Sequence, residues 1–108
     1  MAKLVRDEIP HIIVCSGKRP ITHRGACTNT GLRVLLLDKL GEETKEVQEA
    51  KDRYELMQEL ADVYEVISCI AETVNCSIKD VEDVARVKRN TRGSFKKGIV
   101  LDEVEDAE

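Results

Sequence analysis

Two short acidic patterns constrain this chain more than any other feature, because each places two carboxylates on one face of a helix. Both have the form E-x-x-[E/D]: the first gives Glu43 and Glu46, and the second gives Glu59 and Asp62. Residues three apart on a helix are neighbours, about 5–6 Å apart at Cβ. Twelve residues separate Glu46 from Glu59, which is enough for the chain to turn back on itself. Two antiparallel helices would then gather four carboxylates into one cluster.

A cluster of four carboxylates repels itself unless it is protonated or holds a cation. Ligand sets made only of oxygen suit hard ions, so Mg²⁺ is the natural candidate, with Mn²⁺ as the alternative. One E-x-x-E pattern in a chain with 35% charged residues is usually a solvated helix face. Here, however, Glu43 and Asp62 fall against the apolar stripes of their helices, where an acid without a partner is costly. The sequence therefore favours a metal site.

The rest of the chain also indicates helices, because Gly and Pro are rare in its middle and good helix formers dominate there. We expect an all-α fold, specifically an antiparallel helical bundle completed by oligomerisation. The expected elements are a brief helix from Pro10, a long helix from about 30–32 capped by Asn29 or Thr30, a second from 53 or 54 to Val74 after a break at Asp52, and a last one from Ser77 to about Asn90. Residues 18–31 read as a loop, and Ile99 to Leu101 as a short packed extended segment.

Length, charge and the absence of long apolar runs limit the number of domains, the binding partners and the location of the protein. With 108 residues the chain is expected to form one domain over residues 1–101, followed by an acidic tail at 102–108. A net charge of -4 argues against general binding of a nucleic-acid polymer. No apolar run approaches the roughly 18 residues of a membrane span, and the N-terminus lacks the apolar stretch of a signal peptide. We therefore expect a cytoplasmic protein.

Basic residues near both ends of the fold are candidates for binding phosphate. Lys3 and Arg6 lie near the N-terminus, and the span from Arg86 to Lys97 contains no acid. Cations at a helix C-terminus are ordinarily explained by the helix dipole, but Arg92 to Lys97 continue past Gly93. An acidic metal site beside a basic rim describes a site for a phosphorylated substrate, in which water would attack a phosphorus atom in line.

Several motifs together resemble a known family. The segments KLVRDEIP, EE-x-x-E, ELADVYEV and RGSF are similar to the phosphoribosyl-ATP pyrophosphohydrolase-like branch of the MazG-type, all-α nucleoside triphosphate pyrophosphatases. The resemblance runs from about Lys3 to Leu101. It departs from the family pattern at Arg24 to Gly31, where relatives usually begin an acidic helix, and at Ser94, where they usually have a second glycine.

The resemblance implies an antiparallel helical fold that assembles as a homodimer or homotetramer. It implies Mg²⁺ bound by Glu43, Glu46, Glu59 and Asp62, with Glu42 as a near neighbour. The implied reaction is hydrolysis of a nucleotide between its α- and β-phosphates, giving a monophosphate and pyrophosphate. Phosphate-binding positions are implied at Lys3, Arg6, Arg89, Arg92 and Lys96. By analogy, we expect a lone domain of this kind to be a house-cleaning enzyme, which clears (d)NTPs, rather than to catalyse a biosynthetic step.

Two other interpretations stay open from the residues alone. The same helices would also suit a non-catalytic module that binds a nucleotide or a protein. Alternatively, two pairs with i, i+4 spacing, His11 with Cys15 and His23 with Cys27, could form a metal site. The ordinary interpretation of the cysteines is that they are small buried hydrophobic residues with reduced thiols.

Overall fold

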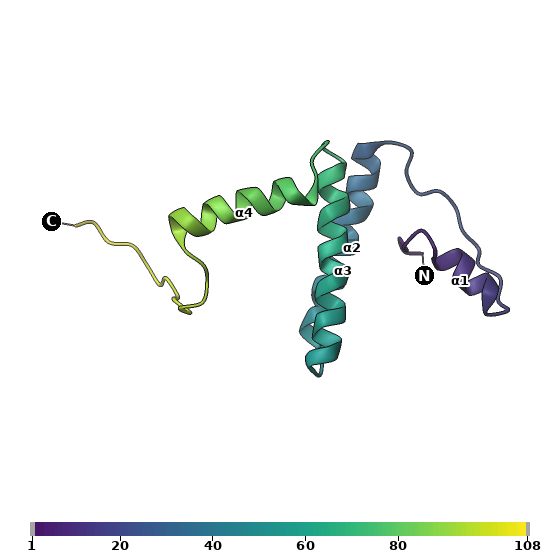
Figure 1. Cartoon of the computed structure of the whole chain (residues 1–108), viewed down its shortest axis with the longest axis horizontal. Helices are drawn as coiled ribbons and strands as arrows, with labels where there is room; N and C mark the ends of the chain where they lie inside the picture. The colour runs from purple at the N-terminus through teal and green to yellow at the C-terminus, as the bar shows by residue number, and fades with distance from the viewer. Residues whose placement is uncertain (1, 108) are drawn as a thin grey trace. The chain divides into compact units, whose positions relative to one another are not determined.

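The computed structural model describes residues 2–107, and in this part of the chain every regular element is a helix (Figure 1). The four helices are α1 (Ile9–Cys15), α2 (Asn29–Glu49), α3 (Arg53–Glu72) and α4 (Ile78–Arg92). The prediction of an all-α fold is therefore confirmed. The chain divides into two compact units, one up to Ile78 and the other from Lys79, and each is described by itself.

The two long helices start where a side chain satisfies a free backbone N–H group. Thr28 caps α2, because its Oγ1 accepts a hydrogen bond from the Gly31 N–H at 3.0 Å. Asp52 caps α3 in the same way, with its Oδ1 accepting from the Glu55 N–H at 2.8 Å. The predicted start of α3 is confirmed. The predicted caps Asn29 and Thr30 are wrong, because both residues are already helical and the preceding threonine has the extended conformation a cap requires.

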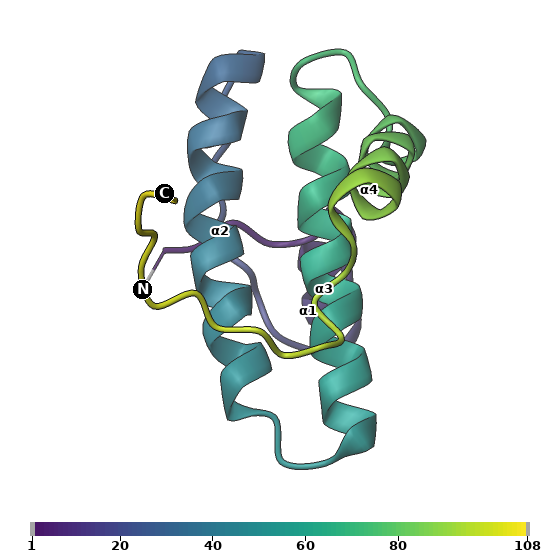
Figure 2. The same cartoon turned by 90° about the vertical axis from the view of Figure 1, so that its left-hand side faces the viewer.

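α2 and α3 run antiparallel and side by side, joined by a tight turn at Ala50–Asp52 (Figure 2). Within residues 2–78 they are the only helices that pack against each other. The buried apolar residues of this hairpin are few: Leu36, Val66 and Ala71. Such a small core leaves much apolar side-chain surface uncovered on both helices.

Hydrogen bonds between α2 and the residue after α3 join the two helices at the open end of the hairpin. Arg33 Nε donates to Thr73 Oγ1 at 3.0 Å, and Arg33 Nη2 approaches the Thr73 carbonyl at 3.4 Å. Thr73 is buried, and its hydroxyl donates in turn to the Ile70 carbonyl at 2.6 Å. The contact closes the hairpin at the end opposite its turn.

α1 is a short helix that ends at a glycine, as the sequence predicts. Gly17 has φ of +85°, and its N–H donates to the Val14 carbonyl at 3.0 Å. The Lys18 N–H donates to the Ile13 carbonyl at 3.2 Å, which completes a Schellman motif. The chain then runs without regular structure to Thr28, so the predicted loop is present, but its last three residues, 29–31, belong to α2 instead.

The second unit holds α4 and the C-terminal segment. No residue of α4 is buried, and Phe95 of the RGSF segment is fully exposed. Ile99, Val100 and Leu101 are 76–81% exposed, so the prediction that they pack is wrong for the described chain. Their backbone forms no ladder with another segment that could hold them down.

Among the described residues, none of the helices has the length and apolar character needed to cross a membrane. All four cysteines are free thiols, and Cys15, Cys27 and Cys76 are exposed. The expectation of buried cysteines is therefore wrong for these three residues, because they lie at the end of α1 and in connecting segments rather than on a packed face.

Candidate metal centre

The α2–α3 hairpin brings the four predicted acids together. Glu43 and Glu46 come from α2, and Glu59 and Asp62 come from α3. One carboxylate oxygen of each residue lies within 4.8 Å of the corresponding oxygen of every other. Antiparallel packing produces this arrangement, since each pair spans one helical turn and the two turns face each other.

Two oxygens in the cluster are buried and have no hydrogen-bond partner: Glu43 Oε2 and Glu59 Oε2. Glu43 itself is only 6% exposed. A buried carboxylate oxygen without a partner is costly, and coordination of a cation removes that cost. The donor set consists only of carboxylate oxygen, which suits Mg²⁺ or Mn²⁺ rather than a softer metal. The residues therefore fit a hard divalent cation.

The pKa values of two acids report the same crowding. Burial, and then the neighbouring Glu46 charge, raise the pKa of Glu43, although Lys39 opposes the shift. The pKa of Glu46 is raised chiefly by a hydrogen bond shared with Glu59, and also by burial and the Glu59 charge. Without a cation, Glu43 and Glu46 therefore hold protons more tightly than separate glutamates would.

A lysine on α2 neutralises part of this charge. Lys39 Nζ lies 3.4 Å from Glu42 Oε1 and 3.4 Å from Glu43 Oε1, and its side chain is mostly buried. Glu42 thus faces Lys39 and stands outside the group of four that could hold an ion. No role in the cluster is predicted for Lys39 from the sequence. The i, i+3 and i, i+4 spacing to the two glutamates is the signal that could have shown it.

An arginine from the N-terminal segment reaches the other helix of the cluster. Arg6 Nη2 donates to Asp62 Oδ1 at 2.7 Å. The hydrogen bond with Asp62 raises the pKa of Arg6, so the guanidinium is a permanent cation there. The sequence indicates Arg6 as a phosphate ligand but gives no sign of its contact with one of the four acids.

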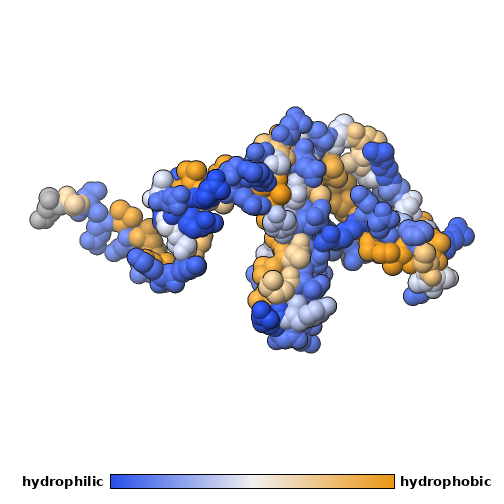
Figure 3. Space-filling model, in the orientation of Figure 1, coloured by the Kyte–Doolittle hydropathy of each residue, from blue (hydrophilic) through white to orange (hydrophobic). Residues whose placement is uncertain are grey.

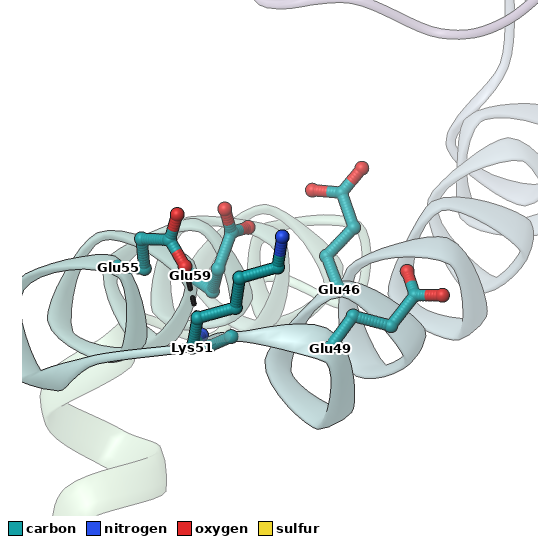
Figure 4. Close-up of a pocket in the computed structure, with 6 residues that line it drawn as sticks. Glu46, Glu49, Lys51, Glu55 and Glu59 are labelled. Atoms are coloured by element: carbon teal, nitrogen blue, oxygen red, sulfur yellow. Dashed lines mark hydrogen bonds between the residues drawn. The ribbon is translucent and has the colours of Figure 1, made fainter.

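A small hollow of about 210 Å³ lies on the hairpin-turn side of the cluster. It is lined by Glu46, Glu49, Glu55 and Glu59, together with Ala50 and Lys51. Figure 4 shows the Lys51 side chain extending between Glu46 and Glu59, while its backbone N–H donates to Glu55 Oε2 at 2.7 Å. This side of the cluster is predominantly negative.

Comparison with known proteins identifies the family. A sequence model described as phosphoribosyl-ATP pyrophosphohydrolase matches residues 17–89, which include all four acids. The chain belongs to the phosphoribosyl-ATP pyrophosphohydrolase family. No curated protein and no solved structure matches the chain.

Family membership confirms the resemblance seen in the motifs and indicates pyrophosphohydrolase activity in general. The phosphoribosyl-ATP pyrophosphohydrolase family typically depends on a divalent metal, and the acidic cluster is where this member can hold one. The matched range leaves out the KLVRDEIP and RGSF segments, so Lys3, Arg6, Arg92 and Lys96 lie beyond it.

The predicted phosphate-binding residues fall into two groups. Lys3 and Arg6 both line one large cavity in the first unit. Arg89, Arg92 and Lys96 belong to the second unit, with Arg89 and Arg92 in the last turn of α4, and their role in binding phosphate stays a prediction.

Within residues 2–107 the structure gathers no cysteine–histidine metal site. His11 Nε2 lies 3.5 Å from Cys15 Sγ, but the acidic cluster is the only group of three or more potential ligands among residues 2–107. His23 and Cys27 do not join the other pair, because they lie in the exposed loop before α2.

Proposed function

We propose that this chain is a Mg²⁺-dependent nucleotide pyrophosphohydrolase, with Mn²⁺ as an alternative ion. It would cleave a nucleotide between the α- and β-phosphates and release a nucleoside monophosphate and pyrophosphate. Its proposed role is the clearance of (d)NTPs. The observation that carries the proposal is the convergence of four carboxylates with two buried, unpaired oxygens, in a member of a pyrophosphohydrolase family.

Glu43, Glu46, Glu59 and Asp62 would hold the ion and make up the catalytic centre. Bound Mg²⁺ would supply charge neutralisation for the phosphate oxygens and Lewis-acid activation. The most exposed member of the cluster, Glu46, is suited to orient the attacking water and accept its proton. The water oxygen would bond to a phosphorus atom, the bridging P–O bond would break, and pyrophosphate would leave.

The cations around the cluster would bind the phosphates. Arg6 already lies at the edge of the cluster, and Lys3 lines the large cavity that Arg6 also lines. Arg89, Arg92 and Lys96, in the second unit, are proposed as further phosphate ligands from the family resemblance. Arg is well suited to the task because its planar guanidinium can bind two phosphate oxygens at once.

We also propose that the protein assembles as a homodimer or homotetramer. Along α3, three large apolar side chains at helical spacing remain open to solvent: Leu56 is 39% exposed, Met57 57% and Leu60 45%. A second copy of the chain would cover them and extend the hairpin into a bundle. The cytoplasmic location remains a prediction from the sequence.

The first test is pyrophosphate release from a panel of nucleoside triphosphates and phosphoribosyl-ATP, with Mg²⁺ and with a chelator. Metal-dependent release from at least one member is expected, and the preferred member identifies the substrate. If no member is hydrolysed at protein concentrations that keep oligomers assembled, the non-catalytic binding module becomes the better description.

A further inference from the structure

A cavity of about 1000 Å³ lies between the N-terminal segment, α1, the loop after it and the first turns of α2. Its wall is largely aliphatic and includes Ile9, Ile13, Ala26, Leu32 and Leu35. Apolar side chains gather around α1 on the surface shown in Figure 3. The volume is at the upper end of the roughly 300–1,000 Å³ that is usual for small-molecule sites.

One side chain connects this cavity to the acidic cluster. Arg6 lines the cavity, and its guanidinium donates to Asp62 at 2.7 Å. The cavity and the cluster are therefore separated by little more than one guanidinium group. A ligand held at the cluster by its phosphates would have its remaining atoms within reach of this cavity.

Charge distinguishes this cavity from the other hollow that borders the cluster. The hollow of about 210 Å³ at the hairpin turn presents four glutamates and one lysine, which repel a polyphosphate. The larger cavity presents Lys3, Arg6 and Arg24, and Asp7 is the only acid among its described lining residues. An anionic ligand with an apolar portion suits the larger cavity in both charge and volume.

We propose that this cavity binds the nucleoside part of the substrate, the base and the sugar, while the phosphates pass Arg6 to reach the acidic cluster. The inference rests on the proposed function and adds the place where the nucleoside lies. No Phe, Tyr or Trp is among its described lining residues, and His23 is the one aromatic ring there, so the base would lie mainly between aliphatic side chains. Affinity for the nucleoside would come from apolar burial, and discrimination between bases would be modest.

The test compares two ligands that share phosphates but differ in the nucleoside. These are α,β-methylene-dATP, which resists cleavage at the scissile bridge, and inorganic tripolyphosphate. Their dissociation constants are measured by calorimetry with saturating Mg²⁺ on the full chain. The cavity is filled by Ile13→Trp within α1 and, separately, by Thr22→Trp on the exposed loop. Val14→Trp is the matched control, because Val14 is exposed on the same helix and does not line the cavity.

Both filling variants are expected to weaken binding of the nucleotide analogue at least tenfold, while binding of tripolyphosphate and the behaviour of Val14→Trp stay at the wild-type level. An unchanged ratio of the two constants in both variants, in a chain that still releases pyrophosphate from nucleotides, would overturn this inference alone. Equal weakening of both ligands leaves that ratio unchanged and counts as the same result. A wild-type chain that neither binds the analogue nor releases pyrophosphate would overturn the proposed function as well.

Discussion

Arg6 and Asp62, 56 residues apart, are joined by a hydrogen bond of 2.7 Å between Nη2 and Oδ1. The contact places a permanent cation against one of the four acids of the cluster. It also attaches the N-terminal segment to α3. Because both side chains are substantially exposed, the pair contributes only about 0.2–1 kcal/mol to folding, so its main effect is on what the cluster binds.

Replacing Arg6 should therefore change metal binding and nucleotide binding in opposite directions. In Arg6→Met, loss of the neighbouring cation should tighten Mg²⁺ binding, since the ion no longer meets a positive charge. Nucleotide binding should weaken by about tenfold, because a charged hydrogen bond to phosphate is lost. Calorimetric titrations with Mg²⁺ alone, and with the methylene analogue at saturating Mg²⁺, measure both changes. If both affinities fell together, Arg6 would have a structural role only.

Neutralising members of the cluster should remove activity without unfolding the protein. Glu46→Gln and Asp62→Asn are each expected to lower metal-dependent pyrophosphate release by about 100-fold or more. Thermal stability in chelator should be kept in Glu46→Gln, because the substitution relieves repulsion. Glu49→Gln is the control, since this exposed acid is on the same helix but outside the cluster. Near-normal release by either cluster variant would show that the site is elsewhere.

The buried Glu43 should make the metal-free protein less stable as pH rises. Its pKa is raised in the folded chain above the value of 4.5 that an unperturbed glutamate has, mainly by burial. Between these two values the folded state binds more protons than the unfolded state, so stability falls as pH increases through that window. In chelator, the melting temperature of the wild type should drop from pH 5 to pH 7.5 more steeply than that of Glu43→Gln.

Added Mg²⁺ provides the complementary observation for Glu43. The wild type should gain melting temperature at pH 7.5 when Mg²⁺ replaces the chelator, because the ion binds the folded state alone. Glu43→Gln should gain less, since it offers one carboxylate fewer. Parallel pH profiles for the two proteins would contradict the assignment of this pH dependence to Glu43.

Self-association of the chain should depend on the apolar face of α3, which a second copy would cover. Leu60→Glu is expected to shift the assembly toward monomer, because a charge would be buried at the interface. Analytical ultracentrifugation over a range of concentrations measures the change. Gln58→Glu adds the same charge on an exposed position of the same helix and should leave the oligomer intact. A wild type that stays monomeric at all concentrations would refute the assembly.

The contact that closes the hairpin should be worth a measurable amount of stability. Thr73→Val keeps the shape of the side chain but leaves Arg33 Nε without its acceptor. The expected loss is about 1–3 kcal/mol in urea unfolding, the usual cost of a polar group left unsatisfied in a buried position. Thr44→Val is the control, because this hydroxyl is exposed and bonds only within its own helix at 2.7 Å. Equal losses in both variants would show that the cross-helix contact is not stabilising.

Local sequence rules predicted most of the helices and the cluster. The break at Asp52 and the end of α1 at Gly17 follow from capping and from glycine's access to positive φ, which depend on neighbours in the chain. The E-x-x-[E/D] spacing predicted which acids share a face. The exact residues at which helices begin and end were predicted less accurately. Thr28 rather than Asn29 or Thr30 caps α2, and α4 ends at Arg92 rather than near Asn90.

The sequence by itself determined the all-α class, the two long helices and the pairing of acids on each, because periodicity and spacing act over one or two helical turns. Only the tertiary structure decided which distant groups meet. It brought Arg6 to Asp62 and Arg33 to Thr73, and it left an open cavity between the N-terminal segment and α2. These contacts join residues far apart in the chain, and their geometry depends on how the helices and loops pack, which no local pattern encodes.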